Sequence, residues 1–167
     1  MKKLILSILL MATVINPVSA GDGDRHVGFQ GGVMFPGILN GVLSVDIETS
    51  YHNAIEFYLD AFTEWKDCRD CGKVCKKSFW KSNYGLGVGA AYKPVVHRSR
   101  NSVGRFRMGA DIGTCNREFS MGIELGYEYV WTFRNNVQFV LQQKNECTFW
   151  GRPTWRFGGL VGLRLPL

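Results

Sequence analysis

The sequence has little proline and little histidine, and long apolar runs are missing from nearly all of it. Its 167 residues include five Pro and three His. Its 20 Gly show no G-X-Y period, which excludes collagen-like and low-complexity chains. Aromatic residues at 13% exclude a disordered chain, which lacks apolar surface to bury. Beyond the N-terminus, no apolar run approaches the ~20 residues that a membrane-spanning helix needs. We therefore expect one compact domain.

The first twenty residues have the pattern of a secretory signal peptide. A positively charged start precedes an apolar stretch at residues 4–15, and the small-residue cleavage pattern Val18-Ser19-Ala20 follows. We predict that residues 1–20 are this signal peptide, that residues 21–167 form a single domain, and that the protein is exported through the secretory pathway.

Apolar and polar residues alternate with period two through most of the remaining chain, which is typical of strands with two unlike faces. The eight alternating segments lie at residues 27–35, 43–51, 55–65, 84–92, 106–112, 121–131, 137–141 and 155–167. No helical periodicity competes with this pattern. The sequence therefore predicts an all-β fold, an eight-stranded antiparallel up-and-down β-barrel of the outer-membrane type.

Alternation alone does not say which face points inward. A soluble barrel would bury its apolar face, whereas an outer-membrane barrel would turn it toward lipid. Aromatic residues near the ends of the apolar faces favour lipid, because interfacial girdles lie there. These residues are Tyr51, Trp65, Tyr84, Tyr92, Tyr129, Trp131 and Trp155. A soluble periplasmic ligand-binding barrel, with its apolar face inside, remains the alternative.

The opposite faces carry glycine and charges of both signs. Inside a small barrel a carboxylate must be paired, so we predict an interior charge network; an ordinary solvated sheet face is the alternative. In this network the acids Glu56, Asp60, Glu124 and Glu128 would pair with Arg105, Arg107, Arg156 and Arg164. The same faces also hold Asp46, Glu48, Asp111 and Lys144. Gly85, Gly87 and Gly89 are expected to make room inside the barrel or against an inward aromatic ring.

Five cysteines gather at one rim if both termini lie on the periplasmic side. Cys68, Cys71 and Cys75 fall in the second outer connection, while Cys115 and Cys147 lie beside the third and fourth. Exported chains favour disulfides, and Cys71–Cys115 or Cys75–Cys147 are candidate pairs, although the odd number leaves one thiol over. The spacing Cys68-x2-Cys71-x3-Cys75 leaves a zinc site open as an alternative, and incidental thiols are a third interpretation.

Catalytic patterns are weak. Hydrolysis of lipid at the outer rim would need a His beside a Ser there. The histidines His26, His52 and His97 fall toward the periplasmic end, and the outer-rim serines are Ser78, Ser82 and Ser120. We therefore predict no enzymatic activity, no cofactor and no metal.

A basic run with aromatic neighbours lies in the longest outer connection and comprises Lys73, Lys76, Lys77, Phe79, Trp80 and Lys81. We interpret it as a charged loop facing anionic lipopolysaccharide, with a docking surface for a protein or DNA as the alternative. No direct nucleic-acid binding is expected.

The order of features resembles the TraO family of conjugative-transposon proteins from Bacteroidetes. The resemblance covers residues 27–36 (VGFQGGVMFP), 55–67 (IEFYLDAFTEWKD), 84–116 and 121–165, and it includes the pair Trp150-Gly151 and the closing RFGGLVGLRLPL. It implies a small non-enzymatic protein of the outer membrane of a Gram-negative bacterium, in contact with lipid and with other conjugal transfer proteins. We expect it to anchor or stabilise a conjugative DNA transfer apparatus. A generic structural outer-membrane barrel and a lipid-modifying enzyme are the alternatives.

Overall fold

The computed structural model describes residues 24–49, 51–64, 84–116, 118–150 and 155–167. The predicted signal peptide, Trp65, the basic run and Cys68, Cys71 and Cys75 lie outside these ranges. Within them, no helix is long and apolar enough to span a membrane. The strands are β1 (Arg25–Phe35), β2 (Ile38–Glu48), β3 (Ala54–Glu64), β4 (Tyr84–Lys93), β5 (Val95–Arg98), β6 (Ser102–Cys115), β7 (Glu118–Thr132), β8 (Gln138–Thr148) and β9 (Trp155–Pro166).

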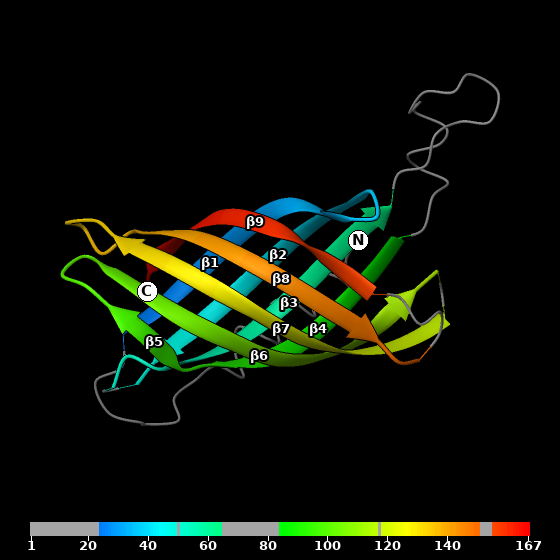
Figure 1. Cartoon of the computed structure of the whole chain (residues 1–167), viewed down its shortest axis with the longest axis horizontal. Helices are drawn as coiled ribbons and strands as arrows, with labels where there is room; N and C mark the ends of the chain where they lie inside the picture. The colour runs from blue at the N-terminus through cyan, green and yellow to red at the C-terminus, as the bar shows by residue number, and fades with distance from the viewer. Residues whose placement is uncertain (1–23, 50, 65–83, 117, 151–154) are drawn as a thin grey trace, which may run out of the picture.

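The strands form one antiparallel sheet that closes on itself (Figure 1). Strands that follow one another in the chain pair, except β4 and β5; in addition β1 pairs with β9, and β4 pairs with β6. Because β4 and β5 occupy successive parts of one position beside β6, the barrel has eight strand positions. This closed eight-stranded antiparallel barrel confirms the predicted fold class. β1 begins and β9 ends at the same end, which we call the termini rim; the opposite end is the far rim.

The sequence pattern predicts no strand between the segments at residues 84–92 and 106–112, and this is wrong. β4 continues through Lys93, β5 follows it, and β6 already begins at Ser102. Pro94 interrupts the strand because it has no N–H to donate, and the pairing with β6 shifts register between Val95 and His97, as at a bulge. The Pro94 carbonyl still accepts a bond from the Phe106 N–H at 3.0 Å, so the barrel wall stays closed here.

Other strand ends also differ from the prediction. The first connection is only the two residues Pro36-Gly37, with Gly37 at φ 64°, so β2 begins at Ile38 rather than at residue 43. At its other end β2 stops at Glu48, and a turn joins the Thr49 N–H to the Asn53 carbonyl at 2.7 Å. In the early part of β2 the inward residues Ile38 and Val42 are apolar and buried. Apolar and polar residues therefore do not alternate there.

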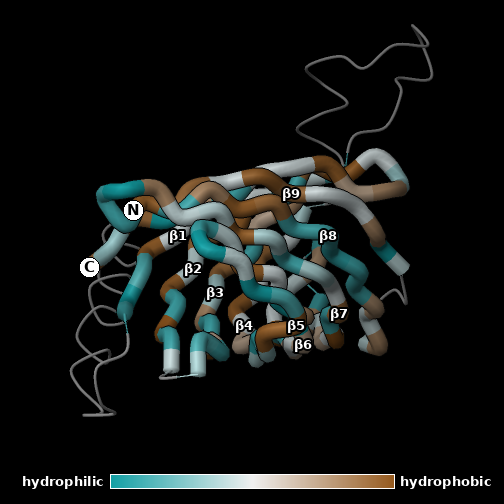
Figure 2. The backbone as a smooth tube through the Cα atoms, turned by 60° about the vertical axis from the view of Figure 1, so that its left-hand side comes forward, coloured by the Kyte–Doolittle hydropathy of each residue, from teal (hydrophilic) through white to brown (hydrophobic). Residues whose placement is uncertain are grey.

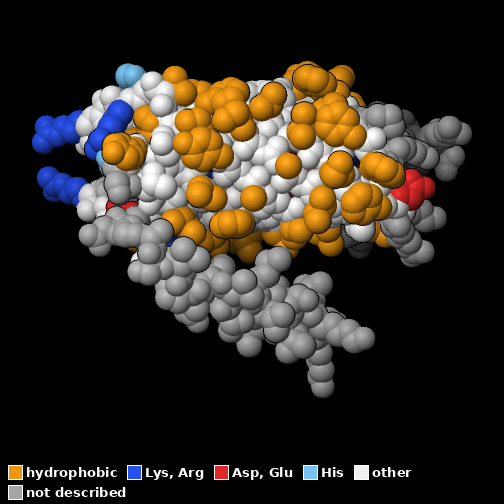
Figure 3. All heavy atoms as spheres, turned by 90° about the horizontal axis from the view of Figure 1, so that it is seen from below, with side chains coloured by type: hydrophobic (Ala, Val, Ile, Leu, Met, Phe, Trp, Pro, Cys, Tyr) orange, Lys and Arg blue, Asp and Glu red, His pale blue; other side chains and the backbone are white. Residues whose placement is uncertain are grey.

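Apolar side chains cover the outside of the barrel. Hydropathy alternates along the strands in Figure 2, and orange side chains spread over the flank between the two ends in Figure 3. Phe29 is 67% exposed and Val161 is 51% exposed, although both lie in mid-barrel strand segments. The soluble alternative, with its apolar face inside, is therefore wrong: the interior is charged and the exterior is apolar. Six of the seven predicted girdle aromatics are described: Tyr51, Tyr84, Tyr92, Tyr129, Trp131 and Trp155 lie near the strand ends.

Inward glycines let the wall and the interior side chains approach closely. A Cβ at Gly85 would meet the Phe62 ring at 2.4 Å, and one at Gly89 would meet the Tyr58 ring at the same distance. Of the three glycines predicted to make room inside the barrel or against an inward aromatic ring, Gly85 and Gly89 therefore face rings, whereas a Cβ at Gly87 would lie 3.3 Å from Asp111 Oδ2.

Replacing Gly162 with alanine is expected to destabilise the barrel. Its Cβ would lie 2.2 Å from the Phe29 carbonyl oxygen and 2.7 Å from the Gln30 Cα, both of β1, and backbone atoms cannot yield. Overpacking of this kind costs about 1–3 kcal/mol. Urea unfolding of the refolded barrel, followed by tryptophan fluorescence, measures the change. The matched control is Gly159→Ala on the same strand, whose Cβ meets only the Gln142 carbonyl oxygen at 3.9 Å; equal losses for both variants would contradict the prediction.

Candidate functional site

Charged side chains fill the interior of the barrel. The described residues place eight carboxylates inside, accompanied by six Lys and Arg side chains. The acids are Asp46, Glu48, Glu56, Asp60, Asp111, Glu124, Glu128 and Glu146, and the bases are Lys93, Arg105, Arg107, Lys144, Arg156 and Arg164. Each charge depends on a partner, because an isolated ion in such a site costs several kcal/mol to desolvate.

Glu128 is the centre of the network toward the termini rim. It receives Lys93 Nζ at 2.8 Å and Arg164 Nη1 at 2.9 Å, while Arg105 Nη1 lies 3.7 Å away. Arg164 also places Nε 2.8 Å from Asp46, and Lys93 places Nζ 2.7 Å from the same carboxylate. Strands β2, β4, β6, β7 and β9 are thereby joined across the lumen.

Arg107 of β6 links this centre to the rest of the lumen. Its Nε donates to Glu56 at 2.7 Å, and its Nη1 donates to Glu124. The guanidinium also lies over the Tyr58 ring, 4.5 Å from the centroid, where a cation–π contact adds to the ion pairs.

Lys144 of β8 is the main cation toward the far rim. It donates to Asp60, and its Nζ lies 2.8 Å from Glu124 and 3.4 Å from Glu146. Arg156 reaches Glu146 at 3.3 Å and stacks over the Phe62 ring, 3.8 Å from the centroid. The Asn40 side-chain amide also donates to Asp60, at 2.5 Å.

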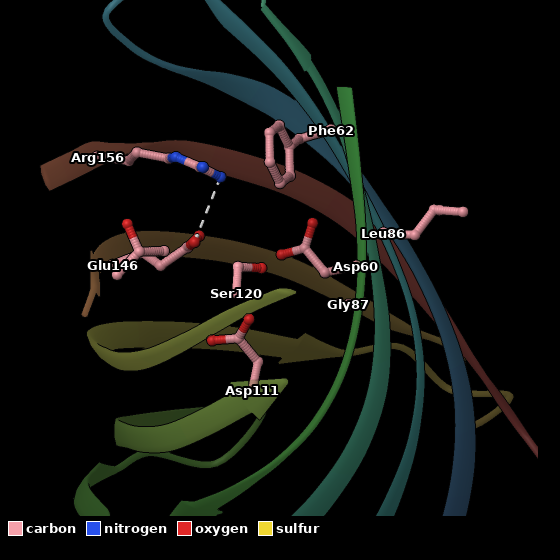
Figure 4. A pocket seen from close by; sticks show the side chains of 9 residues that line it. Asp60, Phe62, Leu86, Gly87, Asp111, Ser120, Glu146 and Arg156 are labelled. Atoms are coloured by element: carbon pink, nitrogen blue, oxygen red, sulfur yellow. Dashed lines mark ion pairs between the residues drawn. The ribbon is translucent and has the colours of Figure 1, made fainter. Parts of the chain in front are cut away.

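A small pocket lies between these groups and the far rim (Figure 4). Its polar lining includes Asp60, Asp111, Ser120, Glu146 and Arg156. Its volume of about 10 Å³ leaves room for one water-sized species. The lining can therefore accommodate a small ion or a water, but not an organic ligand.

The structure places all eight residues of the predicted network in the interior and brings most of them together. Arg107 contacts both Glu56 and Glu124, and Arg164 contacts Glu128. Asp60 pairs with Lys144 rather than with an arginine, and Arg156 pairs with Glu146.

Sequence reasoning left out several members of the network. Lys93 was assigned to a connection because it precedes Pro94, and Glu146 was missed because the seventh segment was ended at residue 141. The alternation of β8 continues through Gln142, Lys144 and Glu146, which are all buried. This period-two pattern is the sequence signal that places Glu146 inside the barrel.

Two cysteines are described, and neither is bonded to another cysteine within the described part of the chain. Cys115 ends β6 and Cys147 lies one residue before the end of β8, so both are at the far rim, as the topology predicted. They do not form a disulfide with each other, and the partners suggested for them, Cys71 and Cys75, lie outside the described residues.

The three histidines lie toward the termini rim. His26 is buried at the start of β1, His52 occupies the β2–β3 turn at φ 61°, and His97 is exposed on β5. Ser120 lines the pocket near the other end of the barrel. Ser120 is the one described serine of the three expected at the outer rim, and no described histidine lies at its end of the barrel.

The packed interior limits what the barrel can do. Glu56, Arg105, Arg107, Glu124, Glu128 and Arg164 are each at most 1% exposed, and Val42, Tyr58, Ala91 and Leu160 form a small apolar cluster among them. Side chains occupy the space where a channel would run, as expected for eight strands. Interactions with other molecules are left to the two rims, the apolar exterior and the small far-rim pocket.

Comparison with known proteins gives the same architecture. No protein-family model matches the chain, and no curated protein matches it. Among solved structures, a major outer membrane protein from Thermus thermophilus is similar at 12% identity and a TM-score of 0.54, covering 87% of this chain and 99% of that chain. The Yersinia pestis outer membrane protein Ail is similar at 11% identity and a TM-score of 0.52, covering 86% and 100%. The chain has the closed eight-stranded fold of outer-membrane barrel proteins.

Proposed function

We propose that this protein is a non-enzymatic barrel of the Gram-negative outer membrane that anchors or stabilises a conjugative DNA transfer apparatus. The observation that carries the membrane assignment is the exposed apolar belt around a charged, filled interior. Such an apolar surface would favour aggregation in water, whereas in a membrane it packs against the lipid tails. The signal-peptide pattern supports export to that membrane.

The packed lumen supports an anchoring role rather than a conduit. DNA needs a wide, polar passage, and buried side chains fill the interior here. A barrel of this kind acts through its rims. The resemblance of its strands to the TraO family supports a conjugal transfer apparatus as the partner.

The termini rim offers a surface for such a partner. Arg98 and Arg100 of the β5–β6 hairpin and Arg134 of the β7–β8 turn are exposed, and Figure 3 shows Lys and Arg side chains projecting at this end. With the termini on the periplasmic side, these arginines face the periplasm. Exposed charges of one sign steer association with an oppositely charged surface.

An in-frame deletion in a donor strain is expected to lower mating frequency, and the wild-type gene is expected to restore it. A variant with Arg98, Arg100 and Arg134 all replaced by Glu should leave mating near the deletion level, because it reverses the charge of the docking rim. The matched control is Glu118→Lys, a charge reversal at the exposed far rim, which should restore mating.

Outer-membrane fractionation and immunoblotting establish that every variant reaches the membrane in equal amount. A deletion that leaves mating frequency unchanged would overturn the conjugative role and favour a general structural barrel. Recovery of the protein in the soluble periplasmic fraction would overturn the membrane assignment itself.

A further inference from the structure

The outward face of β8 changes from apolar to polar partway along the strand. Residues 142–146 read QQKNE, and Figure 2 shows this hydrophilic run along β8. The inward members of the run are buried in the lumen: Gln142, Lys144 and Glu146. Gln143 and Asn145 alternate with them and therefore point outward. The apolar exterior thus carries two neighbouring amides at this place.

These two amides lie in the lipid-facing part of the wall and have no equivalent on the other described strands. Gln143 is at the midpoint of β8 (Gln138–Thr148), and it pairs with Tyr127 of β7 and Gly159 of β9. The remaining Asn and Gln side chains of the described strands are buried in the lumen: Gln30, Asn40, Gln138 and Gln142. Outward amides are therefore confined, within the described strands, to one strip of β8.

An amide that faces lipid tails needs a hydrogen-bond partner, because leaving it unsatisfied in an apolar medium is costly. Asn145 has one, since its Nδ2 donates to the Leu125 carbonyl of β7 at 3.2 Å. The Gln143 side chain is exposed and makes no hydrogen bond with the described residues. The strip therefore presents an unused donor and acceptor to its surroundings.

A gap in the outward side chains lies beside Gln143. Gly159 has no side chain, and a Cβ there would meet only the Gln142 carbonyl oxygen, at 3.9 Å, so the space outside it is open. Phe157, the adjacent outward residue of β9, is 48% exposed, and its ring packs against Phe35 with the centroids 5.2 Å apart. A supported ring thus stands next to a gap, and small residues allow close approach between membrane-embedded proteins.

We propose that this strip, formed by Gln143, Asn145, Phe157 and Gly159, is the interface through which two copies of the chain pair within the membrane. A two-fold axis sets the same surface of each copy against the other, so the surface must complement itself. An amide both donates and accepts, so Gln143 can bond to the same residue of a second copy. The Phe157 ring of each copy can likewise enter the gap at Gly159 of the other. This inference rests on the membrane part of the proposed function and is independent of the conjugative role.

Energy transfer between labelled barrels in phospholipid vesicles tests the pairing. Refolded protein carries a donor or an acceptor dye at its amino terminus, and the lipid-to-protein ratio is varied. We expect transfer above that of randomly placed molecules, with the dilution curve of a dimer. Gln143→Leu should weaken pairing by about tenfold or more, because the amide bonds across the interface are lost. Gly159→Leu should weaken it similarly by filling the gap, and its side chain has room in the single barrel.

Thr63→Leu is the matched control, because it replaces an outward polar residue of β3, four strand positions from β8 and so on the opposite side of the barrel. Its pairing should equal that of the wild type, and unboiled gel migration verifies that each variant is folded. An inserted wild type with only random transfer would overturn the pairing and leave the membrane assignment intact, whereas failure to insert would overturn both. Pairing as strong in Gln143→Leu and Gly159→Leu as in the wild type would also overturn the proposal, because the copies would then meet elsewhere.

Discussion

Replacing Glu128 with alanine is expected to be the most damaging single change in the interior. The substitution leaves Lys93, Arg105 and Arg164 without the carboxylate that all three approach. Removing one partner of a buried ion pair costs about 3–5 kcal/mol because the remaining charge stays desolvated. Urea unfolding of the barrel refolded into detergent micelles measures the loss in the free energy of unfolding.

Two further variants show whether the loss comes from buried charge. Glu128→Gln keeps the shape and should still destabilise the barrel, because the three cations lose the one negative charge that they share and keep only Asp46, Glu48 and Glu56. Glu118→Ala removes an exposed carboxylate at the far rim and should change stability by no more than about 0.5 kcal/mol. If Glu128→Ala were as mild as Glu118→Ala, water would have to solvate the interior cations, and the packed lumen would be refuted.

An arginine at Val161 is expected to produce the second large effect. Val161 points outward from the middle of β9, where it pairs with Gly31 of β1 and Leu141 of β8. On the lipid face of a transmembrane barrel, an arginine at the bilayer midplane costs about 2–4 kcal/mol. Unfolding by urea from phospholipid vesicles gives this cost directly.

The control places the same residue at a rim. Tyr51 is 85% exposed in the β2–β3 turn, where an arginine can reach water and should cost no more than about 1 kcal/mol. Equal tolerance of Val161→Arg and Tyr51→Arg would show that solvent, and not lipid, covers the belt. The pair therefore distinguishes a membrane-spanning surface from an unusually apolar soluble one.

The fold was predictable from the sequence because the period-two pattern survives in nearly every strand. The pattern was less reliable where the inward residue is apolar, as with Ile38 and Val42 of β2, because both faces of the strand then carry apolar residues. Strand ends were also missed where a proline stands beside an inward charge. Pro94 marked the end of a strand locally, but the ladder of β6 continues past it, and pairing with a neighbour is not visible in a single segment.

The composition of the interior was predictable, but its pairing was not. Alternation shows which side chains point inward, so Arg107 and Glu124 could be assigned to the lumen. Which of them touch depends on the stagger between strands and on side-chain length. Asp60 therefore meets Lys144 across 84 positions of sequence. The pocket beside Asp111 was equally hidden, because it depends on glycines from two other strands meeting one carboxylate.

The bonds around Glu128 constrain the order of assembly. Its partners come from β4, β6 and β9, and the last of these, Arg164, lies three residues from the end of the chain. Until β9 arrives, Asp46 and Glu128 lack one of their cations, and an open sheet would present these charges toward hydrocarbon. The inward face must therefore remain hydrated while the strands insert, and it can lose its water only when the first and last strands meet. Closure of the wall and neutralisation of the core are then a single event.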